Sequence, residues 1–188
     1  MAQSTQPDPG LLTACQDDVR FFSSACKDER ERWIFDRWCS LTGRNAAQAT
    51  KGEAPDFTVH GEKIEIVEVL TAGRKRHKEF KDDLATLRTG TSQTADLIHN
   101  GPDLETIKSR AHQWVLNAIR AKHSHYGPSS ASWTLLVYAD FTFADRTDWK
   151  AVTTELSRTP PGFARIEVLF PDGAKSMVLH PALPTHQS

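Results

Sequence analysis

Residues 55–70 read PDFTVHGEKIEIVEVL, and this stretch decides the fold. The segments 55–60 and 63–70 are rich in β-branched and apolar residues and meet at Gly61, which predicts two antiparallel strands joined by a tight turn. The second segment is an apolar run interrupted by Glu65 and Glu68, a pattern typical of a strand that is buried on both faces. Because side chains alternate along a strand, a spacing of three places these two carboxylates on opposite faces.

The turn determines which carboxylate lies beside Asp56. A two-residue turn at residues 61–62 gives the apolar pairs Val59–Ile64 and Phe57–Ile66 and places Asp56 opposite Val67. A three-residue loop would pair Phe57 with Glu65, which fits poorly. The two-residue turn is therefore favoured, and it predicts Asp56, Lys63 and Glu65 on one face and Glu68 on the other.

The flanking sequence predicts helices around this hairpin. Helical patterns cover residues 11–41, 74–87, 103–126 and 145–156, and further strands are expected at 45–50, 132–139, 163–170 and 175–179. The fold class is therefore α/β, with a central mixed sheet flanked by helices. We expect one domain over residues 11–180 and disordered tails at 1–10 and 181–188.

The first predicted helix contains an acidic residue in an apolar stripe. Glu31 shares its helical face with Ile34, Phe35 and Trp38. A carboxylate in an apolar interface needs a cation or a hydrogen-bond donor. It is either a buried Glu paired with an Arg or Lys, or a carboxylate directed at a metal ion. If Glu31, Asp56 and Glu65 converge, a cation must neutralise them, and oxygen ligands favour Mg²⁺ or Mn²⁺.

Composition excludes several classes of protein. The 188 residues carry 23 Lys and Arg against 24 Asp and Glu, so bulk charge cannot hold a phosphate backbone. No apolar stretch is long enough to cross a membrane, and residues 1–10 do not resemble a signal peptide. Three cysteines with no CxxC spacing indicate reduced packing residues, and we expect a cytoplasmic protein.

One helix carries a local positive charge. Arg74, Lys75, Arg76 and Lys78 lie at its start, where the helix dipole disfavours cations. They are candidates for contacts with nucleic-acid phosphates. The alternative is a solvated helix face, balanced by Glu79, Asp82 and Asp83.

The helix with Glu31, the Pro55-Asp56-Phe57 element and the strand with Glu65 resemble the PD-(D/E)XK nuclease superfamily over residues 25–90. The runs ERERWIFDRW and VLTAGRKRHKEFKDDL resemble a small uncharacterised bacterial family within it. The resemblance implies a restriction-endonuclease-like sandwich in which Glu31, Asp56 and Glu65 bind Mg²⁺ or Mn²⁺. It also implies a Lys two residues beyond the acidic residue of the strand, which helps to activate water.

The sequence departs from the superfamily at that Lys. The position is Val67 if Glu65 is the acidic residue, and Leu70 if Glu68 is. Lys63 is the preferred substitute because it shares the face of Glu65, and a lysine from a helix (Lys75, Lys78 or Lys122) is the alternative.

The sequence therefore predicts a metal-dependent endonuclease acting on DNA, with RNA as a possible substrate. The candidate catalytic residues are Asp56, Glu65, Lys63 and Glu68. The alternatives are an inactive nuclease-fold module that binds nucleic acid or a protein, and a purely structural ion-pair network. The sequence does not indicate an oligomeric state.

Overall fold

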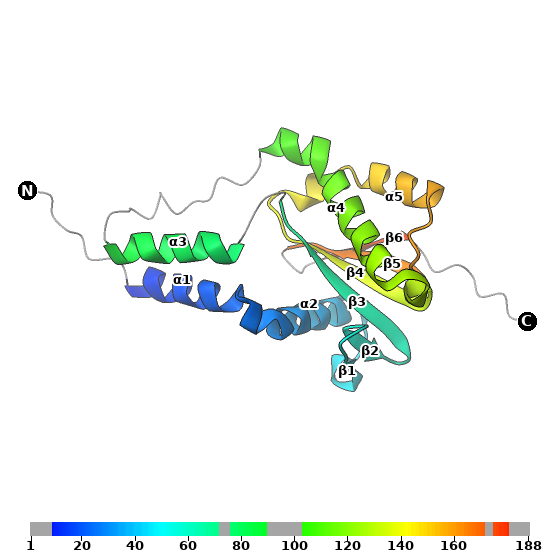
Figure 1. Ribbon diagram of the computed structural model, residues 1–188, viewed down its shortest axis with the longest axis horizontal. Coiled ribbons are helices and arrows are strands. Elements are labelled where there is room, and N and C mark those ends of the chain that lie inside the picture. Colours follow the sequence, from blue (N-terminus) through cyan, green and yellow to red (C-terminus); the bar gives the residue numbers. More distant parts are fainter. Residues whose placement is uncertain (1–8, 72–75, 90–102, 172–174, 181–188) are drawn as a thin grey trace, which may run out of the picture. The chain divides into compact units, whose positions relative to one another are not determined.

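The structure is a computed structural model that describes residues 9–71, 76–89, 103–171 and 175–180 (Figure 1). The predicted tails fall largely outside these residues, except that Pro9 and Gly10 already belong to the first helix. The chain divides into two compact units, residues 1–32 with 73–100 and residues 33–72 with 101–188. The prediction of one domain over 11–180 stays a prediction.

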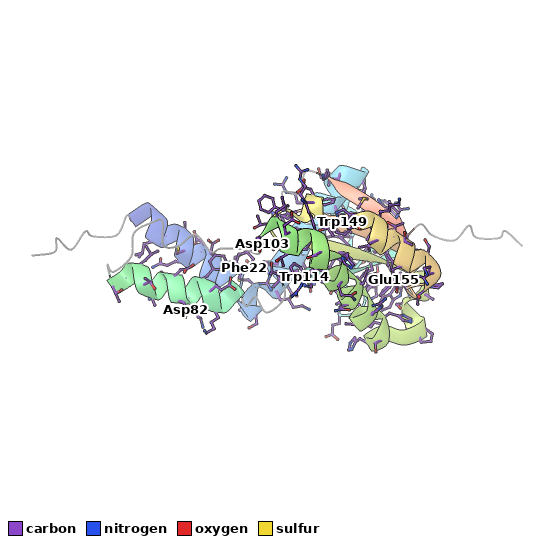
Figure 2. The ribbon with its side chains drawn as sticks, turned by 90° about the horizontal axis from the view of Figure 1, so that it is seen from above. Phe22, Asp82, Asp103, Trp114, Trp149 and Glu155 are labelled. Atoms are coloured by element: carbon purple, nitrogen blue, oxygen red, sulfur yellow. The ribbon has the colours of Figure 1, made fainter. Side chains whose placement is uncertain are left out.

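The first unit is built from helices. It contains α1 (Pro9–Phe21), a short 3₁₀ helix (Ser24–Cys26), the start of α2 (Lys27–Thr42) and α3 (Arg76–Thr89). Cys15, Leu84 and Leu87 form its small buried core. Phe22 stacks on Phe80 with ring centroids 5.0 Å apart, and both Phe22 and Asp82 of this unit are labelled in Figure 2.

The continuous helix predicted over 11–41 is wrong, because the chain breaks at Ser23. This residue is extended (φ −70°, ψ 159°) and precedes the 3₁₀ turn. The guanidinium of Arg30 donates hydrogen bonds to the carbonyls of Phe21 and Ser23 at 2.6 and 2.8 Å. The Phe21 carbonyl is one that the end of α1 leaves without a helical partner. The Ser23 carbonyl also accepts a hydrogen bond from Cys26 N at 3.3 Å. The break is therefore stabilised by a side chain seven to nine residues away.

The second unit contains a six-stranded mixed sheet in the spatial order β1-β2-β3-β4-β5-β6, which confirms the predicted α/β class. The strands are β1 (Thr50–Lys51), β2 (Phe57–Val59), β3 (Glu62–Val69), β4 (Trp133–Ala139), β5 (Arg165–Leu169) and β6 (Ser176–His180). The three central strands β3, β4 and β5 are parallel, and the outer pairs are antiparallel.

Helices cover both faces of this sheet. α4 (Leu104–Tyr126) and α5 (Trp149–Arg158) pack on one face, and the part of α2 from Trp33 onward packs on the other (Figure 1). The α4 face of β3 and β4 carries residues such as Val69, Leu135 and Val137. The α2 face carries Ile64, Ile66, Leu136 and Tyr138. Both faces are therefore apolar, as the sequence of the second strand predicts.

The turn between β2 and β3 lies one residue earlier than predicted, which shifts the pairing of the two strands by two residues. Its central residues are His60 and Gly61, both with positive φ (50° and 80°), as a type I′ turn requires. Phe57 therefore pairs with Ile64 and not with Ile66. A shift of two residues keeps every side chain on its predicted face, whereas a shift of one would have reversed them all. One further step in this register brings Asp56 level with Glu65.

Several element boundaries also differ from the prediction. Residues 45–50 form a 3₁₀ helix (Ala46–Gln48) and the short β1 in place of one strand. Residues 144–146 form a separate 3₁₀ turn, and α5 begins after Asp148, whose side chain accepts a hydrogen bond from Ala151 N at 2.9 Å. α4 begins as predicted after the cap Asp103.

Two further expectations concern the membrane and the cysteines. In the described parts of the chain, no helix is long and apolar enough to cross a membrane. Cys15, Cys26 and Cys39 are free and buried.

Candidate active site

The Asp56 side chain is held against β3 by a hydrogen bond from the backbone of that strand. Asp56 directly precedes β2, and its side chain is buried, with 3 % of its surface exposed. Its Oδ2 atom accepts a hydrogen bond from Ile66 N at 2.8 Å. This bond ties the carboxylate to the residue that follows Glu65, so Asp56 and Glu65 are neighbours across two antiparallel strands.

Glu65 is the most deeply buried of the predicted site residues, with 1 % of its surface exposed. It lies on the face of β3 that α4 covers, level with Leu135 of β4. Its Oε1 atom accepts a hydrogen bond from Tyr126 Oη at 2.8 Å and forms a short ion pair with Lys122 Nζ. Its Oε2 atom is buried and has no hydrogen-bond partner among the described residues.

The two partners of Glu65 come from one face of α4. Lys122 and Tyr126 are four residues apart, which places them one above the other on a helix. The Lys122 ammonium also lies 5.6 Å from the centroid of the Tyr126 ring. The Lys122 side chain is 26 % exposed, whereas the Glu65 side chain is 1 % exposed. The single positive charge of Lys122 balances the charge of Glu65.

Of the four lysines considered from the sequence, Lys122 is the one placed at Glu65. Lys63 shares the face of Glu65 but is exposed. Lys78 is exposed and pairs with Asp82 at 3.5 Å in the first unit, and Lys75 lies outside the described residues. The positions two residues beyond the acidic residues are apolar. Within the described part of the chain, the ammonium that contacts Glu65 comes from a helix.

Glu68 lies apart from Glu65. It is half-buried and pairs in register with Tyr138, whose side chain belongs to the α2 face of the sheet. The predicted division of Glu65 and Glu68 between opposite faces is therefore confirmed. The catalytic role considered for Glu68 stays a prediction.

Glu31 belongs to the first unit, whereas Asp56 and Glu65 belong to the second. It is buried, and its Oε1 atom lies 3.0 Å from Lys27 Nζ, one turn earlier on α2. Of the two alternatives given for Glu31 from the sequence, this ion pair corresponds to the first, a buried Glu paired with an Arg or Lys. Among the described residues, no three Asp, Glu, His or Cys side chains gather closely enough to hold one metal ion. A metal site with three carboxylates stays a prediction.

The predicted phosphate-binding residues lie at and before the start of α3. Arg74 and Lys75 fall outside the described residues, and Arg76 begins the helix. Lys78 is exposed and forms the ion pair with Asp82, as expected for a solvated helix face. Their contacts with nucleic acid stay a prediction.

Sequence reasoning missed Tyr126 as a site residue. The available signal was the spacing of Lys122 and Tyr126 on one helical face, but no pattern links that face to a strand about sixty residues earlier. It also missed Glu167 of β5, which is 1 % exposed. Glu167 accepts hydrogen bonds from Trp38 Nε1 at 2.7 Å and from Arg165 Nε at 2.5 Å. Both of its oxygens have donors, so this carboxylate is structural.

Comparison with known proteins identifies the family. Residues 10–185 match a family described as "Putative endonuclease, protein of unknown function (DUF1780)". The chain belongs to the DUF1780 family. The match spans both units, so the candidate site and the basic helix α3 lie within the family's shared region.

The fold of this DUF1780 protein is also similar to a solved structure. That structure is a protein of unknown function, PA4535, from Pseudomonas aeruginosa strain PAO1, described as belonging to the monooxygenase superfamily. The TM-score is 0.50 at 18 % sequence identity, with 92 % of this chain and 82 % of the other covered. At this identity the likeness concerns the fold alone. Among curated proteins, none matches the chain.

Proposed function

We propose that this DUF1780 protein is a metal-dependent nuclease that cleaves phosphodiester bonds in DNA, with Asp56, Glu65 and Lys122 at its centre. The observation that carries the proposal is the state of Glu65. Oε1 is held by Lys122 and Tyr126, while Oε2 is buried and has no hydrogen-bond partner in the described part of the chain, and Asp56 is bound to the next residue of the strand. The description of the family as an endonuclease supports the same conclusion.

The proposed fold is the restriction-endonuclease-like sandwich. In support, the antiparallel strands β1, β2 and β3 are followed by the parallel strand β4. The PD element immediately precedes β2, and the acidic residue lies in the middle of β3. The PD element followed by the acidic strand is part of the pattern on which the sequence resemblance rests.

The residues present fit a hard divalent cation. A buried carboxylate oxygen without a donor costs free energy unless a ligand meets it. Among the described residues Oε2 of Glu65 is such an atom, and the Asp56 carboxylate is held at the backbone N–H of Ile66, the residue that follows Glu65. Carboxylate oxygens are the ligands preferred by Mg²⁺ and Mn²⁺. Asp56 and Glu65 would hold the ion, which supplies Lewis-acid polarisation of a phosphoryl oxygen and makes water a better nucleophile.

Lys122 takes the place of the missing lysine of the strand. Its ammonium reaches Glu65 from α4, and its side chain is partly exposed, so that a phosphate oxygen can approach it. A positive charge at this position attracts the phosphate and stabilises charge that develops on it. Tyr126 holds Oε1 of Glu65 and so orients the carboxylate.

A second candidate is an inactive module that binds nucleic acid through the same fold. The observation that favours it is that Lys122 already neutralises Glu65 through a direct ion pair. A carboxylate balanced in this way is stable without a metal ion. Binding would then depend on exposed cations such as Lys78.

A cleavage assay on plasmid and single-stranded DNA separates the two candidates. Each metal, Mg²⁺ and Mn²⁺, is tested with the wild type and with Asp56→Asn, Glu65→Gln and Lys122→Met. Lys63→Met is the matched control, because it removes an exposed lysine from the same face of β3. We expect the first three variants to lose at least about a hundredfold in rate and the control to retain activity. DNA binding without cleavage in either metal would favour the inactive module, and cleavage that survives Asp56→Asn would overturn the proposed site.

A further inference from the structure

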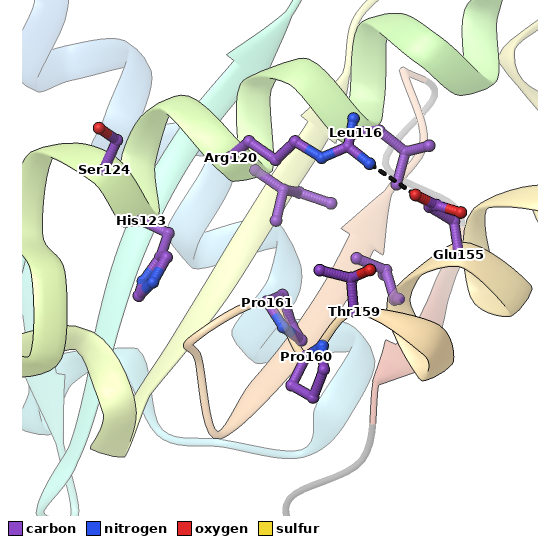
Figure 3. Close-up of a pocket in the computed structure, with 10 residues that line it drawn as sticks. Leu116, Arg120, His123, Ser124, Glu155, Thr159, Pro160 and Pro161 are labelled. Atoms are coloured by element: carbon purple, nitrogen blue, oxygen red, sulfur yellow. Dashed lines mark hydrogen bonds and ion pairs between the residues drawn. The ribbon is translucent and has the colours of Figure 1, made fainter.

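A pocket of about 310 Å³ lies between α4 and α5 in the second unit (Figure 3). Its floor is apolar and is formed by Leu116, Ile119 and Leu156, which are buried. Polar side chains from both helices surround this floor, among them Arg120, His123 and Glu155. An apolar pocket with a few convergent polar groups is typical of a site for a small organic group.

The ring of His123 is held in one position. Its Nδ1 atom lies 3.4 Å from Oγ of Ser130, which is fully buried. Ser130 has one hydroxyl proton, and the carbonyls of Gly127 and Gly162 accept it at 2.8 and 2.9 Å. Toward His123 the hydroxyl can therefore only accept, so the network assigns the ring proton to Nδ1. In the neutral ring, Nε2 is then the nitrogen left as an acceptor.

Gly162 provides the space for this ring. A Cβ atom at residue 162 would lie 2.1 Å from the His123 imidazole, and the φ of Gly162 is +72°. Any other residue would therefore displace the ring. The position of His123 thus depends on two features outside α4, the Ser130 hydroxyl and the bare backbone of Gly162.

Arg120 and Glu155 place a donor and an acceptor side by side. Arg120 Nη2 lies 2.8 Å from Glu155 Oε1 and joins α4 to α5 across the pocket (Figure 3). The two side chains are 51 % and 37 % exposed. A guanidinium has five N–H donors and a carboxylate about four lone pairs, so one contact leaves both able to bind a ligand. Arg120 and Glu155 together are best suited to bind a planar group that itself carries a hydrogen-bond donor next to an acceptor.

A nucleobase has these properties. Its faces are apolar enough to lie on aliphatic side chains, and its edge presents hydrogen-bond donors next to acceptors. Arginine and glutamate are among the side chains that bind base edges, and a base turned out of its stack is read in this way. A purely apolar ligand would leave Arg120 and Glu155 unused, and a simple anion would be repelled by Glu155.

The position of the pocket relative to the candidate active site supports this ligand. His123 follows Lys122 directly in α4, and successive helical residues point about 100° apart. Lys122 contacts Glu65 while His123 lines the pocket, so one turn of helix borders both sites. We propose that the pocket between α4 and α5 binds a nucleobase of the nucleic-acid substrate, adjacent to the phosphate at Glu65 and Lys122. This inference rests on the proposed nuclease function and specifies how its substrate is bound.

The test is saturation-transfer NMR with the four 2′-deoxynucleosides, which carry a base but no phosphate. The decisive variant exchanges the pair, Arg120→Glu with Glu155→Arg, and so keeps the ion pair and the net charge while reversing donor and acceptor. The control makes the same exchange at Lys108 and Glu105, an exposed pair on the same helix with an Nζ–Oε1 distance of 3.0 Å. We expect at least one nucleoside to bind to the wild type and to the control, and its signal to fall at least fivefold in the decisive variant. The chemical shift of the His123 Nε2 nitrogen should change when a nucleoside binds.

Three results would overturn the proposal: no binding of any nucleoside, equal binding by both exchange variants, or equally strong binding of deoxyribose 5-phosphate, which would indicate an anion site. The measurement needs neither metal nor cleavage, so its failure differs from the failure of the nuclease function. Nucleoside binding by a wild type that does not cleave DNA would overturn the proposed nuclease function and support the proposed base-binding pocket. If the wild type cleaves DNA, the Arg120–Glu155 exchange leaves the cleavage rate unchanged and no nucleoside binds, the base-binding proposal is overturned and the nuclease function is not.

Discussion

Lys122 and Tyr126 lie one turn apart on α4 and both contact the same oxygen of Glu65. The other oxygen faces no donor among the described residues. A carboxylate with one satisfied and one unsatisfied oxygen is held in a fixed orientation while one side stays available for a ligand. Glu167 provides the contrast within the same sheet, because both of its oxygens have donors.

The first prediction concerns the ion pair of Lys122. We expect Lys122→Met to lower the free energy of unfolding by about 2 kcal/mol, because Glu65 would stay buried without its cation. The value lies below that of a fully buried pair because the Lys122 side chain is 26 % exposed. Urea denaturation measures the change. Lys63→Met should stay within about 0.5 kcal/mol of the wild type, as an exposed substitution does.

The double variant Lys122→Met with Glu65→Gln completes this test. Since Glu65→Gln removes the charge that Lys122 balances, the double variant should lose less stability than the sum of the two single changes. Strict additivity of the two changes would mean that the ion pair contributes no coupling energy.

The second prediction concerns metal binding. Mg²⁺ or Mn²⁺ at saturating concentration should raise the melting temperature of the wild type, because a ligand that binds the folded state stabilises it by mass action. Glu65→Gln and Asp56→Asn should abolish this rise. Glu167→Gln, which alters an equally buried carboxylate in the same sheet, should retain it. Differential scanning calorimetry with and without the metal makes the comparison, and an equal rise in Glu65→Gln would place the ion elsewhere.

The local pattern of the sequence was sufficient to predict most of the sheet and the faces of its central strand. The alternation of residues 63–70 places Glu65 and Glu68 on opposite faces, and this holds in the structure. The turn was misplaced because His60 adopts a positive φ of 50°, which is uncommon for a residue other than glycine. The error moved the pairing by an even number of residues, so the side chains on each face were still predicted correctly.

The partners of Glu65 could not be predicted in the same way. Lys122 was one of four candidate lysines in the sequence, and the packing of α4 on β3 determines which of them reaches the carboxylate. The break at Ser23 has a similar cause, since the Arg30 side chain that stabilises it acts across several residues. Sequence periodicity describes which face a residue occupies, but not what lies opposite that face.

The third prediction concerns the pH dependence of stability in the first unit. Burial raises the pKa of Asp18, and the neighbouring charge of Asp17 raises it further. An acid with a raised folded-state pKa binds its proton more tightly in the folded protein, so stability falls as pH rises from the unfolded pKa through the folded one. Asp18→Asn should therefore stabilise the protein at neutral pH by less than about 1 kcal/mol. The gain should disappear at a pH below the unfolded pKa of Asp18, about 3.9. Denaturation at several pH values measures it, and an equal gain at every pH would exclude this origin.

The fourth prediction concerns Gly162 and the ring of His123. Gly162→Ala should lower the free energy of unfolding by about 2 kcal/mol, because it adds strain at a φ of +72° to a clash with the imidazole. For a chain of this length the melting temperature should fall by about 4 to 8 °C. Gly43→Ala is the matched control, since its φ is +70° but its Cβ would meet nothing within 4 Å. It should show the conformational cost alone. Adding His123→Ala to Gly162→Ala relieves the clash, so the double variant should lose less stability than the sum of the two single changes. If Gly162→Ala and Gly43→Ala cost the same, the imidazole does not depend on the space that Gly162 leaves.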